Sequence, residues 1–201
     1  MSKEKRSLKR AQILKTATQI FASQGFSQAS MDDIAAQTPV SKATLYKYFK
    51  DKNDLFIQVV TARCEAVREA LGQSMNLAKD PLKALVHVAM NYWELIHSPE
   101  ALSLNSMLIA QKRQFPQQAQ LYYASGPQCM LRLLADFLKE IAPRLHLKID
   151  DFDLAAVTFV NLVRGDTYYR ALLGLEVNRS SKKRDAVIEH ALQIFIKGYQ
   201  A

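Results

Sequence analysis

Residues 31–50 decide the fold of this chain, and they read MDDIAAQTPVSKATLYKYFK. Their apolar residues recur at helical spacing, which predicts two short helices joined by a tight turn. Ser30 precedes the first helix and Asp33 follows three residues later, an Asp variant of the capping box. Pro39 ends that helix, because the residue before a proline is disfavoured in α conformation. Ser41 can cap the second helix.

The second of these helices has one apolar and one polar face. Val40, Leu45 and Phe49 form an inward set, and Ala35 is small where the two helices would cross. The residues left to face outward are Lys42, Ala43, Thr44, Tyr46, Lys47 and Tyr48. This pattern predicts a helix-turn-helix, a unit that places its second helix in the major groove of DNA.

Length and charge support this interpretation. The chain has 201 residues, of which 49% are hydrophobic, enough for one large domain or two small ones. The net charge is +8, and residues 1–52 hold 10 Lys and Arg against 4 Asp and Glu. Such a basic module is expected to meet a polyanion, with nucleic acid favoured over a membrane surface. A soluble protein with a basic tail is the simpler alternative.

Helical periodicity dominates the whole sequence, so we expect an all-α fold of about nine helices and no strand. Caps, prolines and glycines place the expected helices at 7–24, from 31, 41–48, 51–71, from 80, from 98, 116–141 with a break at Gly126-Pro127, 150–173, and 180–199. Composition shifts near residue 52. We therefore expect a DNA-binding domain at 1–52 and a larger helical domain at 53–201.

Several classes of protein are disfavoured by the sequence. The six glycines are widely spaced and form no phosphate-binding loop, and the four histidines form no zinc motif. The two cysteines lie far apart, so we expect no metal site, no cofactor and no enzyme. The N-terminus leads into no signal-peptide core, and no apolar run is long enough to cross a membrane. We expect a cytoplasmic protein.

A resemblance adds to this interpretation. The motif is similar to that of the TetR family of bacterial one-component transcriptional regulators. The similarity rests on Arg10-x2-Ile13-Leu14-x2-Ala17-x3-Phe21-x3-Gly25-Phe26, Ser30-x3-Ile34-Ala35, and Val40-Ser41-Lys42-x-Thr44-Leu45-Tyr46-x-Tyr48-Phe49-x2-Lys52-x2-Leu55. The family usually has Gly where this chain has Pro39. Proline cannot adopt a left-handed conformation, so we expect a locally different turn.

The resemblance implies contacts with double-stranded DNA by Arg10, Ser30, Lys42, Ala43, Thr44, Tyr46, Lys47, Tyr48 and Lys52. Lysines can donate to guanine edges or phosphates, and helix N-termini bind phosphate. Local explanations stand beside these roles. The lysines can be merely solvated, the Thr44 hydroxyl can be satisfied within its helix, and Tyr48 can be half-buried packing. The basic residues at 3–10 can be a solvated tail.

For the second domain the resemblance implies a homodimer through the helices near 150–173 and 180–199, and a pocket for an unidentified small-molecule effector. The candidate pocket residues are Met90, Trp93, Met107, Tyr122, Tyr123, Met130, Phe137 and Phe159. Candidate polar anchors are His87, Asn91, Asn105, Asn161 and Arg164. Methionine and aromatic side chains suit an adaptable apolar cavity, but they also build ordinary cores. Likewise, the last two helices can simply close a monomer.

These observations together favour a sequence-specific regulator that binds a pseudo-palindromic operator. Its expected action is repression, relieved when a ligand selects a form that releases DNA. The alternatives are an activator, a ligand-independent DNA-binding protein of the same fold, and a helical module whose hairpin only resembles a helix-turn-helix.

Overall fold

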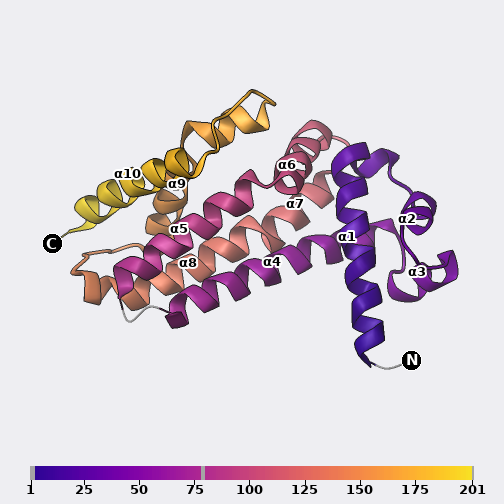
Figure 1. The fold of residues 1–201 in the computed structure, drawn as a ribbon, viewed down its shortest axis with the longest axis horizontal. Helices are drawn as coiled ribbons and strands as arrows, with labels where there is room; N and C mark the ends of the chain where they lie inside the picture. Colours follow the sequence, from indigo (N-terminus) through magenta and orange to yellow (C-terminus); the bar gives the residue numbers. More distant parts are fainter. Residues whose placement is uncertain (1–2, 78–79, 201) are drawn as a thin grey trace. The chain divides into compact units, whose positions relative to one another are not determined.

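The computed structural model describes the backbone of residues 3–77 and 80–200, and their side chains except at 3–4, 63–64, 66–68, 70–71, 73–77 and 111. The helices along this part of the chain (Figure 1) are α1 (Lys3–Gln28), α2 (Met31–Gln37), α3 (Lys42–Tyr48), α4 (Lys52–Leu77), α5 (Pro81–His97), α6 (Pro99–Gln111), α7 (Pro116–Ser125), α8 (Pro127–Ile141), the short 3-10 helix η1 (Ala142–Leu145), α9 (Phe152–Leu172) and α10 (Ser181–Tyr199). The prediction of an all-helical fold is confirmed.

The chain forms two compact units. Unit 1 consists of Met1–Arg63 with Pro99–Gly126, and unit 2 of Cys64–Ser98 with Pro127–Ala201. Helix α4 contributes residues to both units. Helices α6 and α7 belong to unit 1, where α6 packs along α1. The domain boundary expected at residue 52 stays a prediction.

Unit 1 is organised around a cluster of aromatic rings. Phe26 contacts Phe56 edge-on with 5.2 Å between ring centroids, and it contacts Phe115 in the same way at 5.1 Å. Phe21 meets Phe56 edge-on at 5.5 Å. Such edge-to-face pairs stabilise beyond their buried area. Because these rings come from α1, α4 and the residue before α7, they join segments far apart in the sequence.

Unit 2 has its own core, built from α5, α8, α9 and α10. Helix α9 packs against all three of the others. Phe159 on α9 and Phe195 on α10 are buried and meet edge-on with 5.2 Å between centroids. None of the described helices combines the length and the apolar character needed to span a bilayer.

The helix boundaries follow the signals in the sequence. Asp80 Oδ1 accepts hydrogen bonds from the backbone N–H groups of Leu82 and Lys83, as expected for a cap before a proline. The expected interruption at Gly126 is a complete break, because α7 ends at Ser125 and α8 begins at Pro127. These short-range rules account for most of the element bounds.

Two glycines interrupt helices with backbone angles that other residues avoid. Gly25 has φ 81° and ψ 161°, which confirms the predicted end of the first helix there, but one further helical turn follows to Gln28. Gly165 has φ 54° and ψ −168° inside α9, where the sequence indicated an unbroken helix. A side chain would be strained at this φ, so glycine permits the kink.

Candidate functional site

The helix-turn-helix of unit 1 begins with the predicted capping box. Ser30 Oγ accepts a hydrogen bond from the Asp33 N–H at 3.0 Å, and Asp33 Oδ2 accepts from the Ser30 N–H at 3.2 Å. At the start of α3, Ser41 Oγ accepts from the Thr44 N–H at 3.2 Å. Both helices are short, so their ends depend on these side-chain acceptors.

The turn between α2 and α3 has a conformation that accommodates Pro39. The Val40 N–H donates to the Thr38 carbonyl at 2.7 Å, which closes a three-residue turn centred on Pro39. An inverse γ-turn needs a central φ near that of proline. No residue of this described turn has a positive φ. The chain therefore uses a different turn from one built on a left-handed glycine, as expected.

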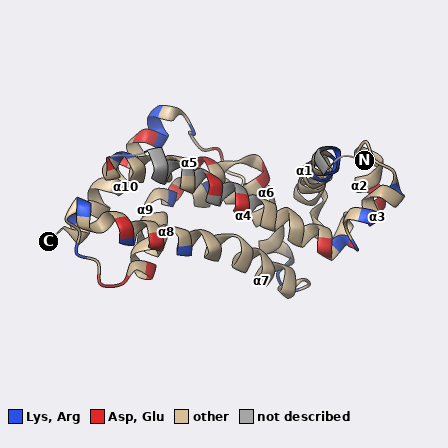
Figure 2. Cartoon of the chain, turned by 90° about the horizontal axis from the view of Figure 1, so that it is seen from below, with Lys and Arg blue, Asp and Glu red and all other residues tan. Residues whose placement is uncertain are grey.

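The inner face of α3 is fixed by the core of unit 1. Leu45 and Phe49 are fully buried, and so is Ile34 on α2. The outer face carries Lys42, Ala43, Tyr46 and Lys47, all of them exposed. Figure 2 marks basic residues along α3 and α1 in blue. The outer face therefore offers cationic and phenolic groups to a ligand in solution.

Lys42 is paired with an acidic neighbour on α2. Its ammonium lies 2.6 Å from Asp32 Oδ1, and both side chains are largely exposed. The hydrogen bond to Asp32, and then its charge, raise the pKa of Lys42. An exposed pair of this kind adds little stability, because water and salt screen it. A phosphate group could therefore replace Asp32 as the partner of Lys42.

Thr44 and Tyr48 are less accessible than their neighbours on α3. The Thr44 hydroxyl lies 2.9 Å from the Ser41 hydroxyl. The Tyr48 hydroxyl is buried and has no hydrogen-bond partner among the described residues. Arg6 of α1 lies over the Tyr48 ring, with 6.0 Å from Cζ to the centroid. A phosphate contact by Tyr48 requires its ring to turn outward, and the DNA contacts of both residues stay predictions.

Lys52 has a structural role that the sequence did not reveal. Its ammonium donates to the carbonyls of Phe26 at 2.8 Å, Ser27 at 3.2 Å and Ala29 at 2.9 Å, at the end of α1. It also lies 4.7 Å from the centroid of the Phe26 ring. Burial lowers the pKa of this lysine. These three hydrogen bonds use all three hydrogens of the ammonium, so Lys52 has no free donor for a phosphate in this structure. Its phosphate contact stays a prediction.

The N-terminal basic residues lie in the first turns of α1. Lys5, Arg6 and Arg10 are exposed, and the side chain of Lys3 lies outside the described residues. Arg10 Nη2 donates to Gln58 Oε1 of α4 at 2.6 Å. This bond holds the guanidinium beside α4 within unit 1, and the predicted DNA contact of Arg10 is untested.

The eight predicted pocket residues are divided between the units. In unit 2, Trp93, Met130, Phe137 and Phe159 are buried in the core, and Met90 is half-buried. In unit 1, Met107 is buried, Tyr122 packs against the core, and Tyr123 is exposed. As a set, these residues stay a predicted pocket.

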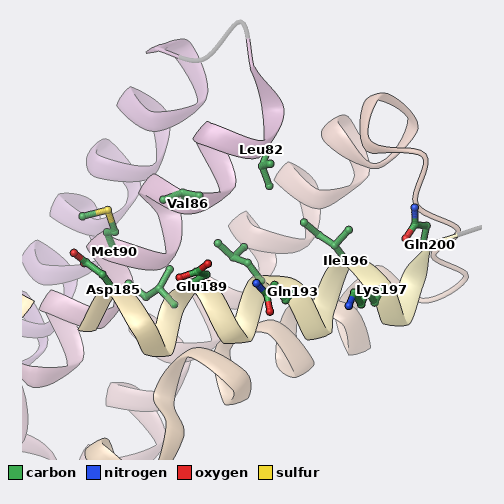
Figure 3. Close-up of a pocket in the computed structure, with 11 residues that line it drawn as sticks. Leu82, Val86, Met90, Asp185, Glu189, Gln193, Ile196, Lys197 and Gln200 are labelled. Carbon is green, nitrogen blue, oxygen red and sulfur yellow. The ribbon is translucent and has the colours of Figure 1, made fainter. Parts of the chain in front are cut away.

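A groove of about 600 Å³ lies between α5 and α10 in unit 2 (Figure 3). Its apolar walls are Leu82, Val86, Met90, Ile188, Leu192 and Ile196, and its polar lining is Asp185, Glu189, Gln193, Lys197 and Gln200. This volume is in the range of small-molecule sites. Of the predicted pocket residues, Met90 lines this groove.

Polar and aromatic groups gather on the buried side of α5 and α9. Arg164 Nε donates to the Tyr92 hydroxyl at 2.7 Å, and burial raises the pKa of Tyr92 to about 12. The rings of Trp93 and His97 are stacked with 3.9 Å between centroids. Trp93 Nε1 and His97 Nε2 are buried without a hydrogen-bond partner among the described residues. Each such atom costs about 1–3 kcal/mol, so the pair is unusual in a core.

Comparisons with known proteins identify the kind of regulator. The model for bacterial regulatory proteins of the tetR family matches residues 13–59, which contain the helix-turn-helix. The model for the AefR-like transcriptional repressor C-terminal domain matches residues 83–201, more than half of the chain. The chain belongs to the TetR family. It is therefore a helix-turn-helix transcriptional regulator, and this family is not one of enzymes.

Individual TetR-type proteins are similar over nearly the whole chain. YvkB, an uncharacterized HTH-type transcriptional regulator of Bacillus subtilis (strain 168), is 25% identical over 94% of this chain and 96% of its own length. The structure of the flavonoid-responsive regulator FrrA has 33% identity and a TM-score of 0.73, covering 96% of this chain and 98% of its own. A TetR-family regulator from Mesorhizobium loti has the same fold, with a TM-score of 0.85 and 24% identity over 100% of both chains.

Replacing Asp32 with Asn should strengthen DNA binding by this TetR-family domain. The change frees Lys42 and removes a negative charge beside the expected phosphates. We expect binding roughly threefold to tenfold tighter at low salt, with a steeper salt dependence, since one more cation meets a phosphate. Fluorescence anisotropy with duplex DNA measures both. Asp136→Asn on α8 is the charge-matched control and should change little. Equal or weaker binding by the Asp32 variant would contradict the role given to Lys42.

Replacing Lys52 with Met should destabilise the protein, because the carbonyls at the end of α1 lose their shared donor. We expect the free energy of unfolding to fall by about 2 kcal/mol. Urea denaturation of the full chain measures it. Lys50→Met, at an exposed neighbouring position, should stay within about 0.5 kcal/mol of the parent. If both variants were equally stable, the three hydrogen bonds would have no net effect.

Proposed function

We propose that this TetR-family regulator is a repressor that binds a pseudo-palindromic operator and leaves it when a small molecule binds. The observation that carries the proposal is the outer face of α3. Its inner face is locked by Leu45 and Phe49, so Lys42, Tyr46 and Lys47 are presented together to a DNA groove. The match to an AefR-like repressor C-terminal domain supports repression over activation.

The operator is read by two copies of the chain. Helix α3, the recognition helix, covers a single half-site of the operator. A two-fold dimer supplies a second α3, which enters the next major groove. Exposed apolar side chains on α9 and α10 support a dimer through these helices: Leu154 is 59%, Val157 37% and Ile194 44% exposed. Such surface costs free energy in water and suits a helix-pairing interface.

Release requires a ligand that binds preferentially to one form of the dimer. In that form the distance between the two α3 helices does not match the two half-sites. FrrA, a relative of this chain, is described as flavonoid-responsive. The groove between α5 and α10 offers a volume suited to a small molecule. Helix α4 contributes residues to both units and is the element that transmits the change. Binding to an operator places the protein in the bacterial cytoplasm.

The double substitution Tyr46→Ala and Lys47→Ala tests the DNA-binding face. Both side chains are exposed, so the variant should remain folded. We expect operator affinity to fall about a hundredfold, the combined loss of two contacts. Fluorescence anisotropy on the chain's own upstream DNA measures affinity, and circular dichroism checks the fold.

The matched control removes a tyrosine and a lysine elsewhere, with Tyr123→Ala on α7 and Lys139→Ala on α8, both at exposed positions outside α3 and outside the proposed dimer helices. It should bind the operator like the parent. If the α3 variant binds as tightly as this control, the outer face of α3 does not contact DNA.

A further inference from the structure

One face of α5 combines an apolar groove with unpartnered polar atoms. Leu82, Val86 and Met90 follow one another at four-residue spacing and line the groove in Figure 3. Trp93 lies three residues beyond Met90, and His97 four residues beyond Trp93. At three- and four-residue spacing, helical side chains lie on one face. The stripe therefore runs from the groove, whose α5 lining ends at Met90, to the Trp93–His97 pair that is buried beyond it.

The two polar atoms of the pair require different partners. His97 Nδ1 lies 2.9 Å from the Trp93 carbonyl oxygen, which can only accept, so Nδ1 carries the hydrogen. Burial lowers the pKa of His97, so the ring is neutral and its Nε2 is an acceptor. Trp93 Nε1 is a donor. Both side chains are nearly fully buried, at 3% and 2% exposure, and both atoms lack a partner among the described residues.

Three neighbouring side chains surround the pair. Tyr168 meets the His97 ring edge-on, with 6.0 Å between centroids, and Arg164 lies over Tyr168. Arg179 donates to the His97 carbonyl at 2.9 Å. These contacts hold the rings in place, while Trp93 Nε1 and His97 Nε2 have no hydrogen-bond partner among the described residues.

At this end of the groove one arginine is bonded to two carboxylates. Arg184 Nη1 lies 2.6 Å from Glu94 Oε1, and Arg184 Nε lies 2.8 Å from Asp185 Oδ1. Asp185 lines the groove beside Met90 in Figure 3. Because Arg184 is bonded to both carboxylates, it is not free to bind an anionic ligand. The six apolar side chains that line the groove favour an uncharged ligand.

We propose that the α5–α10 groove and the Trp93–His97 pair bind a neutral apolar molecule that carries a hydroxyl group. The apolar part packs on Val86, Met90 and Leu192. The hydroxyl donates to His97 Nε2 and accepts from Trp93 Nε1, so one group satisfies both atoms. The proposal rests on the proposed ligand-released regulator and gives its effector a chemical class, with an aliphatic alcohol and a phenol as the two sources.

The test compares matched ligands on the full-length protein. 4-Hexylphenol and 1-octanol carry the hydroxyl, whereas 4-hexylanisole replaces it with a methyl ether that cannot donate. Trp93 is the single tryptophan of the chain, so its fluorescence reports binding next to His97. We expect at least one hydroxyl compound to bind about tenfold tighter than the ether, because only it satisfies both atoms. The hydroxyl compound that binds distinguishes a phenol from an alcohol.

Two variants locate the site by calorimetry. His97→Phe keeps a stacked ring but removes the acceptor, and should reduce binding of the hydroxyl compound to that of the ether. Val86→Phe fills the groove and should abolish binding of both. Ile109→Phe adds the same ring at an exposed position of unit 1 and should change nothing. If His97→Phe fails to fold, Val86→Phe and the ligand series still decide the result.

Several results would overturn the proposal. Equal affinity for phenol, alcohol and ether would exclude the role of the Trp93–His97 pair, as would no binding at all to the folded protein. A change in sedimentation of Val86→Phe without any ligand effect would make the groove a contact between copies. Binding of a hydroxyl compound without release of operator DNA would support this site and contradict the ligand-released regulator. Failure of the binding site and failure of the proposed function therefore give different results.

Discussion

The ammonium of Lys52 joins the end of α1 to the start of α4 through three backbone carbonyls. Those carbonyls would otherwise end a helix without donors in a partly buried place. The same junction carries the ring of Phe26, which packs on Phe56 and Phe115. The helix-turn-helix is built against this junction, since α2 and α3 bury their apolar faces in the same core. The outer face of α3 owes its orientation to these contacts.

The core of unit 2 differs from that of unit 1, because it contains polar side chains at positions where apolar residues would also pack. Arg164 bonds Tyr92 next to the kink at Gly165, and Trp93 and His97 stack with unmet nitrogen atoms. Departures from local rules of this kind are expected where a site, rather than stability, sets the residue types. Unit 1 offers an exposed helix face, whereas unit 2 offers a groove and buried donors and acceptors.

The sequence predicted the parts of the fold that depend on short-range chemistry. The Ser30–Asp33 box, the proline-led helix starts and the outward face of α3 follow from residues a few positions apart. The sequence did not predict the three hydrogen bonds of Lys52, because their acceptors are backbone carbonyls, which no sequence pattern indicates. The kink at Gly165 was missed because a glycine inside an apolar helix has several explanations. The groove brings together α5 and α10, and sequence spacing does not determine such a pairing.

We infer that the capped helix-turn-helix, with its proline-centred turn, reads a specific DNA sequence. Anisotropy of the unsubstituted protein on its own upstream DNA and on scrambled DNA, over a series of salt concentrations, tests it most directly. We expect tighter binding to the upstream DNA at every salt concentration, with affinity falling steeply as salt rises. Equal, weak binding to both DNAs would contradict sequence-specific recognition. Absence of binding at low salt would contradict the DNA-binding role itself, with the turn at Pro39 as the first suspect.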